Sequence, residues 1–235
     1  QSLNRVYDGT VTSQINVFIN SPGPGTQVQM DYRDIGYWDL IWRNIRRCNV
    51  FLSNIDEANV RSESLRQRWK AEAKVLRAYY YMDMIARFGP MPISEEPYPI
   101  TYDTRELSRG SFEDCVRFII NDCEEAIDNE FLPWRITTNS EARRMTKAVA
   151  AIVKSRAILY LASDLWNGGQ DYWEEAEQIT SESLNQCLAN GYALYSTVLN
   201  PSLFESAYHE YHCRPTDYST SPVDTETILA SRSTN

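Results

Sequence analysis

Helical periodicity runs through almost the whole chain and limits its fold more than any other feature. Apolar side chains recur at three- and four-residue steps, as they do on one face of an α-helix. The expected helices span roughly residues 3–19, 37–57, 64–88, 111–127, 146–164 and 172–189. Only "TETILAS" at 225–231 resembles a β-strand. The sequence therefore predicts an all-α protein.

Proline and glycine separate the helical segments. "SPGPG" at 21–25 and "FGP" at 88–90 each end a helix, because glycine adopts the left-handed cap conformation and proline cannot continue a helix. Ser64 and Gln67 have the spacing of a capping box, and Ser111 can cap the following helix. The connections expected to form loop insertions are 20–36, 89–110 and 131–145.

Successive long helices joined as antiparallel pairs resemble a tetratricopeptide-type solenoid. The segments 146–164 and 172–189 are the best repeat candidate. Small residues would let these two helices approach closely, namely Ala148, Ala151, Ala157 and Ala162. The 89–110 connection interrupts a regular repeat. We therefore expect residues 1–235 to form a tetratricopeptide-like helical superhelix with long loop insertions.

Three consecutive tyrosines, Tyr79, Tyr80 and Tyr81, lie inside the third expected helix. Neighbouring residues on a helix point about 100° apart, so the three rings cannot form one flat platform for a ligand. Tyr80 continues the apolar stripe that contains Leu76 and Met84, and it is expected to be buried. The other two tyrosines are expected to be shared between helices or partly exposed. We interpret all three as scaffold.

Charge and cysteine content disfavour several classes of protein. The net charge of −9 makes nucleic-acid binding unfavourable, since a phosphate backbone repels such a surface. No run of about 18 apolar residues is present that could span a membrane. The cysteines are widely spaced without a C-x-x-C motif, which predicts buried apolar side chains rather than a disulfide framework. They are Cys48, Cys115, Cys123, Cys187 and Cys213.

No catalytic or metal-binding motif stands out. In "YHEYHC" at 208–213 the two histidines are three residues apart, which is not the four-residue spacing of H-E-x-x-H, and we expect a loop without a metal here. The adjacent acids at 95–96, 124–125 and 174–175 would point about 100° apart on a helix and would not converge on one bond. The sequence favours a binding protein without a cofactor over an enzyme.

One segment resembles a known family signature. "AEAKVLRAYYYMDMIARFGPMPI" at 71–93 is similar to the motif of the SusD/RagB family of nutrient-capturing outer-membrane lipoproteins of Bacteroidetes. The matching positions are Glu72, Ala73, Leu76, Arg77, Ala78, Phe88, Gly89 and Pro92. A tryptophan-led helix with Trp38, Cys48 and Asn49 precedes this motif in the family order. "RGSFEDCVRFIINDCEEAIDNEFLP", "TKAVAAIVKSRAILYLAS" and "DTETILASRSTN" follow it in that order.

The resemblance implies a role in uptake without catalysis. Such proteins bind an oligosaccharide or, in the RagB branch, oligopeptides, and act as a lid that delivers the ligand to a SusC-type TonB-dependent transporter. They are lipid-anchored at the cell surface, through an N-terminal anchor that is not present in this chain. Family members are roughly twice as long, so we expect the N-terminal half of a protein or an otherwise incomplete chain, whose irregular C-terminal region is largely absent. A tetratricopeptide-like adaptor that binds only proteins, or a helical enzyme with carboxylates from absent residues, are the alternatives.

A glycan site needs flat aromatic faces with polar groups at their edges, presented by loops on a rigid scaffold. Two expected loops combine such residues, "QMDYRDIGYW" and "LPWRITTN". The candidate ligand-binding residues are Asp31, Tyr32, Arg33, Tyr37, Trp134, Arg135 and Asn139. Tyr32 and Tyr37 could instead pack their loop onto the next helix. Trp134 is expected to be exposed, at a ligand site or at the transporter interface, whereas Trp38 is assigned to the core.

Overall fold

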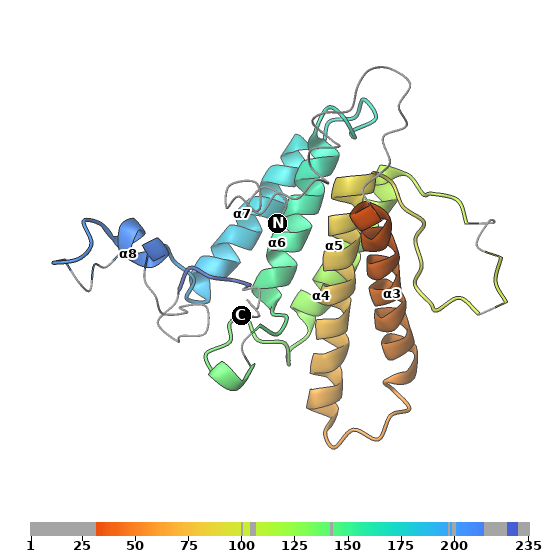
Figure 1. Ribbon diagram of the computed structural model, residues 1–235, viewed down its shortest axis with the longest axis horizontal. Coiled ribbons are helices and arrows are strands. Elements are labelled where there is room, and N and C mark those ends of the chain that lie inside the picture. Colours follow the sequence, from red (N-terminus) through yellow and green to blue (C-terminus); the bar gives the residue numbers. More distant parts are fainter. Residues whose placement is uncertain are drawn as a thin grey trace. The chain divides into compact units, whose positions relative to one another are not determined.

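A computed structural model describes residues 32–99, 101–103, 107–141, 143–196, 198, 201–213 and 225–229, apart from the side chains of 32–37 and 139. Within these residues the regular secondary structure is entirely helical, which confirms the all-α expectation (Figure 1). The elements are α3 (Tyr32–Asn54), α4 (Glu63–Phe88), α5 (Phe112–Asp128), the 3₁₀ helix η2 (Asn139–Glu141), α6 (Lys147–Ala162), α7 (Trp173–Ala189) and α8 (Ala207–Cys213). The helix expected at 3–19 lies outside the described residues.

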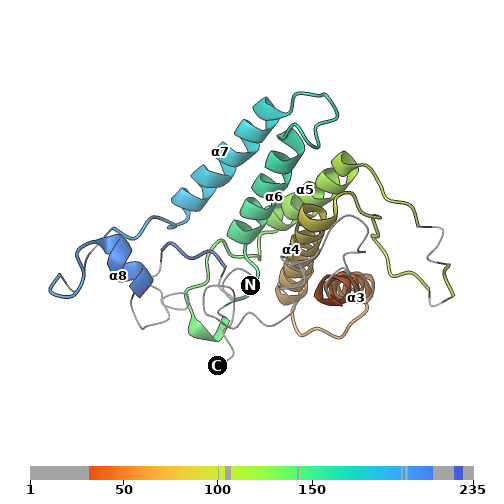
Figure 2. The same ribbon diagram turned by 45° about the horizontal axis from the view of Figure 1, so that its top comes forward.

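The chain divides into two compact units, Gln1–Arg43 and Asn44–Asn235, and the boundary falls within α3. In the larger unit, α4 packs on α5, α5 on α6 and α6 on α7, and α4 also contacts α6. Figures 1 and 2 show α6 and α7 side by side as an antiparallel pair. The four small residues predicted to allow close approach are buried, namely Ala148, Ala151, Ala157 and Ala162.

Two helix starts differ from the sequence expectation. Helix α3 begins at Tyr32 rather than near 37, because the chain has no proline between Pro24 and Pro90 that would stop the helix from extending toward its N-terminus. Helix α4 is capped by Ser62, whose hydroxyl accepts a hydrogen bond from the Leu65 N–H at 3.1 Å. The capping box expected from Ser64 and Gln67 is therefore wrong.

The cap expected at the start of α5 is confirmed. The Ser111 hydroxyl accepts a hydrogen bond from the Asp114 N–H at 2.9 Å, and the Asp114 carboxylate accepts one from the Ser111 N–H at 3.0 Å. Two unpaired N–H groups at the helix start are satisfied in this way. The Ser111 hydroxyl also donates to the Asp114 carboxylate at 2.6 Å, and this hydrogen bond, together with the one from the Ser111 N–H, lowers the pKa of Asp114.

The buried tyrosine of α4 is Tyr81, and the expectation for Tyr80 is wrong. Tyr81 is 0% exposed and Tyr79 is 38% exposed, while Tyr80 is half-buried. The helical period was predicted correctly, but the buried face is centred about one residue later, since α4 contacts both α5 and α6. The Tyr81 ring meets Phe118 edge-on at 4.9 Å, and its hydroxyl accepts a hydrogen bond from the Ser94 N–H at 2.9 Å. Burial raises the pKa of Tyr81.

A buried ion pair joins α4 to α5. The Nε and Nη2 atoms of Arg77 donate to the two carboxylate oxygens of Asp122, each at 2.7 Å. The side chains are only 7% and 2% exposed. Burial alone would lower the pKa of Arg77, but hydrogen bonds from its guanidinium to Asp122 raise that pKa above its ordinary value, so the guanidinium stays charged.

The same guanidinium reaches two further segments. Its Nη1 atom donates to the Asn49 side-chain oxygen at 2.9 Å and to the Glu95 carbonyl at 3.1 Å. The Asn49 amide in turn donates to the Ser94 carbonyl at 2.9 Å. Arg77 therefore ties the C-terminal part of α3, helix α5 and the turn around 94–96 to α4. The signature residues Arg77 and Asn49 act as scaffold here.

The 89–110 connection is closed at its base. The Gly110 N–H donates to the Met91 carbonyl at 3.1 Å, and Arg109 Nη1 donates to the Phe88 and Pro90 carbonyls at 2.8 and 3.1 Å. Gly89 has a φ of 71°, and an added Cβ would lie 3.0 Å from the Trp166 ring. The glycine is therefore required both by its backbone angle and by the space available.

Two expectations near the C-terminal end are wrong. Residues 225–229 form no strand, although the Ala193 N–H donates to the Thr225 carbonyl at 2.9 Å. "YHEYHC" belongs to the short helix α8 rather than to a loop, with Glu210 buried on its inner side.

Among the described residues, no group of three or more His, Cys, Asp or Glu side chains could hold a metal ion. No helix in the described ranges is both long and apolar enough to cross a membrane.

We predict one reactive thiol in the native chain. Cys48, Cys115, Cys123 and Cys187 are buried, while Cys213 is exposed. Burial raises the pKa of Cys48 to about 11, so its thiolate, the reactive form, is scarce at neutral pH. Maleimide should modify Cys213 in the native protein and all five cysteines in denaturant, as measured by mass spectrometry. Modification of a buried cysteine at the rate of Cys213 would contradict the packing described.

Candidate functional site

The 131–145 segment, which carries the sequence-predicted Trp134 and Arg135, is held against α4. Arg144 Nη2 and Nε bind the Glu72 carboxylate at 2.6 and 2.9 Å, and Arg68 binds the same carboxylate at 3.0 Å. Arg68 also pairs with Glu141 at 2.9 Å. These charge-assisted contacts fix the segment on a rigid helix, and Glu72 is a further signature residue with a structural role.

Trp134 and Arg135 are brought together at Tyr192, which follows α7. The Tyr192 hydroxyl donates to the Trp134 carbonyl at 3.2 Å. The Arg135 guanidinium lies 5.8 Å from the Tyr192 ring centre and donates to the Gly191 carbonyl at 3.4 Å. Trp134 is half-buried rather than exposed, because its ring packs against the cluster of Ala148, Ala151, Cys187 and Tyr192. We call Trp134, Arg135 and Tyr192 the Trp134 edge.

The remaining sequence candidates are less fully described. Tyr32, Arg33 and Tyr37 lie on α3 rather than in a loop, where the four-residue spacing of Arg33 and Tyr37 places them on one face. Asn139 begins η2. Asp31 and the side chains of these four residues lie outside the described part of the structure, so their contribution to a site stays a prediction.

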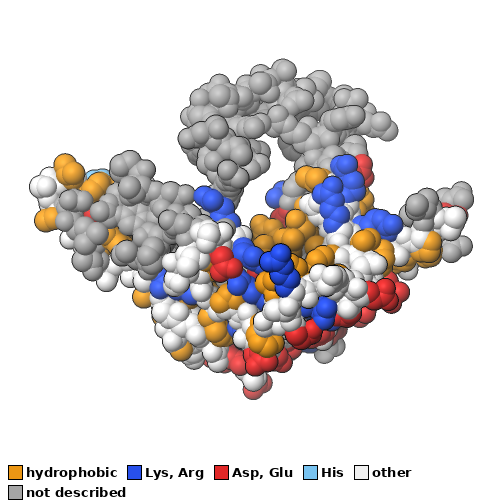
Figure 3. Space-filling model, turned by 90° about the horizontal axis from the view of Figure 1, so that it is seen from below, with side chains coloured by type: hydrophobic (Ala, Val, Ile, Leu, Met, Phe, Trp, Pro, Cys, Tyr) orange, Lys and Arg blue, Asp and Glu red, His pale blue; other side chains and the backbone are white. Residues whose placement is uncertain are grey.

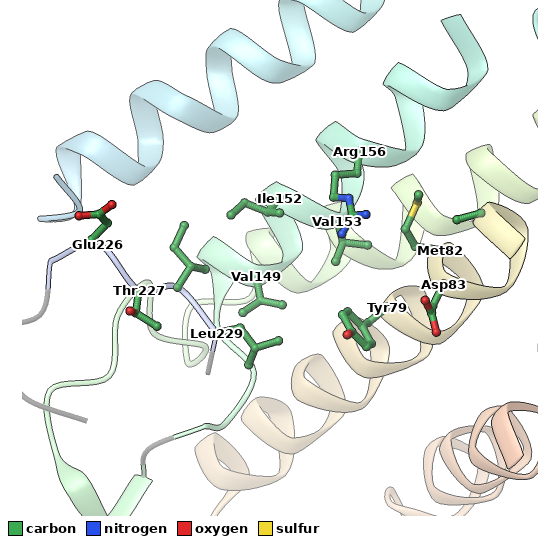
Figure 4. Close-up of a pocket in the computed structure, with 12 residues that line it drawn as sticks. Tyr79, Met82, Asp83, Val149, Ile152, Val153, Arg156, Glu226, Thr227 and Leu229 are labelled. Carbon is green, nitrogen blue, oxygen red and sulfur yellow. The ribbon is translucent and has the colours of Figure 1, made fainter. Parts of the chain in front are cut away.

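A second concave region was missed by the sequence reasoning. A hollow of about 410 Å³ is lined by one face of α4, one face of α6 and the non-helical segment 226–229 (Figure 4). Its lining residues are Tyr79, Met82, Asp83, Ala86, Val149, Ile152, Val153, Arg156, Glu226, Thr227, Ile228 and Leu229. Figure 4 shows Tyr79 and Leu229 entering the hollow from different elements. The one signal of this hollow in the sequence was Tyr79, which was expected to be shared between helices or partly exposed. We call this region the α4–α6 hollow.

The two regions differ in chemistry. The Trp134 edge offers the half-buried Trp134 ring and the Arg135 guanidinium, which suit a ligand with apolar faces and hydroxyl or carbonyl groups, while the Tyr192 ring is buried and positions them. The α4–α6 hollow is lined mainly by aliphatic side chains, with charges at Asp83, Arg156 and Glu226. Asp83 pairs with Arg87 at 3.2 Å. The face seen in Figure 3 likewise shows hydrophobic side chains gathered in a hollow bordered by Lys and Arg.

Comparisons with known proteins agree with the fold and the signature. The SusD-like family model described as "Starch-binding associating with outer membrane" matches residues 6–159. SusD-like protein P25 of Formosa agariphila is 25% identical over 165 residues, which cover 70% of this chain and 29% of that protein. A SusD-like protein of Bacteroides ovatus is 28% identical over 138 residues, which cover 57% of this chain and 23% of that protein.

Solved structures give the same result. BT4246 is 30% identical with a TM-score of 0.64, over 71% of this chain and 32% of that one. A SusD-like protein of Bacteroides fragilis is 26% identical with a TM-score of 0.58, over 71% of this chain and 29% of that one. The 235 residues thus span about a third or less of these relatives. The tetratricopeptide-like helical fold is confirmed, and the chain belongs to the SusD-like (SusD/RagB) family.

Proposed function

We propose that the protein binds glycans at the outer surface of the outer membrane and passes them to a SusC-type TonB-dependent transporter, without catalysis. The observation that carries the proposal is the match of the starch-binding SusD-like family model to residues 6–159. The relatives are longer than this chain, so the proposal concerns the whole protein. A lipid anchor upstream of Gln1 would hold the protein at the membrane.

The Trp134 edge supports binding of a sugar. A sugar ring has an apolar C–H face that stacks on an aromatic side chain and a polar rim that accepts hydrogen bonds from a guanidinium. Trp134 and Arg135 are adjacent in sequence and are positioned by Tyr192 and Gly191. The ion pairs of Glu72 hold their segment on α4, which lowers the entropy cost of ordering the site on binding.

The proposal predicts that Trp134→Ala weakens glycan binding by about tenfold or more, since aromatic anchors commonly contribute more than about 1.4 kcal/mol. Isothermal titration calorimetry of the full-length ectodomain against a glycan panel measures the loss. Trp134→Leu keeps apolar packing on the Ala148 cluster but removes the aromatic face, so it separates stacking from folding. Trp173→Ala is the matched control, because Trp173 is 54% exposed on α7 and should leave binding unchanged.

Three results would contradict parts of the proposal. If peptides bind and no glycan does, the substrate class is wrong and the peptide-binding alternative applies. If Trp134→Ala and Tyr32→Ala both leave glycan affinity intact, these residues lie outside the site. If the whole protein hydrolyses the glycan that it binds, the proposed lack of catalysis is wrong.

A further inference from the structure

The sequence contains two Asn-Gly pairs, and the fold holds them in different ways. Asn167 and Gly168 lie in the connection between α6 and α7, at one end of that antiparallel helix pair (Figure 2). Asn190 and Gly191 directly follow the last turn of α7. An asparagine before a glycine is chemically distinctive, because no Cβ shields the glycine nitrogen from the side-chain amide carbon. Since both pairs share this chemistry, a difference in their reactivity would come from the fold.

The backbone of the first pair is open. Gly168 and Gly169 are exposed, with φ values of 59° and 83°, and a Cβ added to either would meet no atom within 4 Å. In the part of the chain that the structure describes, the Gly168 N–H donates no hydrogen bond. No contact therefore has to break before the Gly168 nitrogen can react.

The residues around this pair are held in place. The Trp166 and Asn167 N–H groups both donate to the Ser163 carbonyl at 3.0 Å, and the Gln170 N–H donates to the Asn167 carbonyl at 3.0 Å. The Asn167 side-chain oxygen accepts a hydrogen bond from the Gly169 N–H at 2.9 Å. This bond turns the side-chain carbonyl toward the following backbone, as in an Asx turn, and stabilises negative charge that develops on its oxygen. The amide carbon of Asn167 is thus activated next to an unbonded N–H.

The second pair is closed by hydrogen bonds. Asn190 Nδ2 donates to the Gln186 carbonyl at 2.8 Å, which holds the side chain back along α7. The Gly191 N–H donates to the Leu188 carbonyl at 3.2 Å, and the Gly191 carbonyl accepts from Arg135 at 3.4 Å. The end of α7 has to open locally before the Gly191 nitrogen can approach the Asn190 side chain.

We propose that Asn167 is a site of spontaneous covalent modification, at which the asparagine converts to aspartate and isoaspartate without an enzyme. The Gly168 nitrogen forms a bond to the side-chain amide carbon of Asn167, and the bond from that carbon to the amide nitrogen breaks. Ammonia leaves with the proton that the Gly168 nitrogen loses, and a cyclic imide remains. Water then opens the imide. Breaking the new bond gives aspartate, and breaking the original peptide bond gives isoaspartate.

The two products change the connection differently. Aspartate keeps an oxygen that can accept from the Gly169 N–H, and it adds a negative charge between the exposed Asp164 and Asp171. Isoaspartate adds the same charge and also lengthens the main chain by one methylene, at a residue whose N–H and carbonyl both hold the turn. The inference does not depend on the proposed glycan binding.

Timed incubation of the protein expressed from its complete gene, at mildly alkaline pH, measures both pairs in one molecule. Conversion at Asn167 should be at least about tenfold faster than at Asn190, because hydrogen bonds at Asn190 have to open first. Trypsin would leave both pairs on one peptide, since no Lys or Arg lies between Arg156 and Arg214. A protease that cleaves after glutamate separates them, for example at Glu182, before mass spectrometry.

Two controls use the same protein. In denaturant the two pairs should convert at similar rates, because the hydrogen bonds that distinguish them are lost. In isotopically labelled water the new carboxyl group should carry the label, since the imide is opened by water.

Three outcomes would overturn the proposal. Equal native rates at the two pairs, or faster conversion at Asn190, would show that these hydrogen bonds do not control the reaction. Conversion of both pairs in denaturant but of neither in the native protein would show that the whole protein protects the connection. An unlabelled product would exclude the imide route. Glycan binding is measured separately, so each proposal can fail alone.

Discussion

Replacing Arg77 with methionine is expected to lower the free energy of unfolding by about 3–5 kcal/mol, among the largest effects of any single substitution in this chain. The change leaves the Asp122 carboxylate, which is 2% exposed, without its bidentate partner. It also removes the donor to the Asn49 side chain and to the Glu95 carbonyl. Urea unfolding followed by circular dichroism measures the loss.

Two further variants show whether the loss comes from a stranded charge. Arg77→Met with Asp122→Leu removes both ions, and it should recover a large part of the stability lost by Arg77→Met alone. Lys70→Met is the surface control, because Lys70 and Asp56 form an exposed ion pair at 2.8 Å whose removal costs about 0–1 kcal/mol. Equal losses for Lys70→Met and Arg77→Met would refute the central role of the buried pair.

Replacing Tyr81 with alanine is expected to cost about 3–5 kcal/mol, since it empties the space of a fully buried ring beside Phe118. Tyr81→Phe keeps the ring and removes the hydroxyl that accepts from the Ser94 N–H, so it should cost about 1–3 kcal/mol. Thermal or urea unfolding of the single variants measures both losses.

The neighbouring tyrosines are the matched controls. Tyr79→Ala should cost less than about 1 kcal/mol, because the side chain is 38% exposed. Tyr80→Ala should fall between the two, since Tyr80 is half-buried and meets Tyr79 edge-on at 6.1 Å. A loss at Tyr80 equal to that at Tyr81 would place the buried face of α4 where the sequence pattern put it.

Local signals in the sequence predicted well where the long helices form. They predicted less well which face of a helix is buried. The Ser111 cap of α5 and the Thr146 cap of α6 are local side-chain signals, and α7 ends at Asn190 directly before Gly191. The buried face of α4 depends on α5 and α6 together, and a helix packed on two sides has no single stripe to read. Choosing Ser62 over Ser64 as a cap likewise depends on where the helix starts in three dimensions.

The candidate site was harder to predict for a related reason. Trp134 was identified from its position after a proline in a polar segment, but its packing on Ala148 and Cys187 comes from residues far away in sequence. Arg77, Glu72 and Asn49 could be recognised as family signature residues, yet only the structure shows that Arg77 binds Asn49 and that Glu72 binds Arg144. The signature therefore reports the scaffold and carries no information on ligand identity.

The closed base of the 89–110 connection has a consequence for how such chains can change in length. Because Gly110 and Arg109 bind the backbone at 88–91, the ends of the connection stay together whatever lies between them. Doubling a flexible loop with fixed ends costs only about 0.6 kcal/mol in chain entropy. Residues added beyond the Ser94–Glu96 turn would leave the helices undisturbed, so this connection can acquire new sequence at little thermodynamic cost.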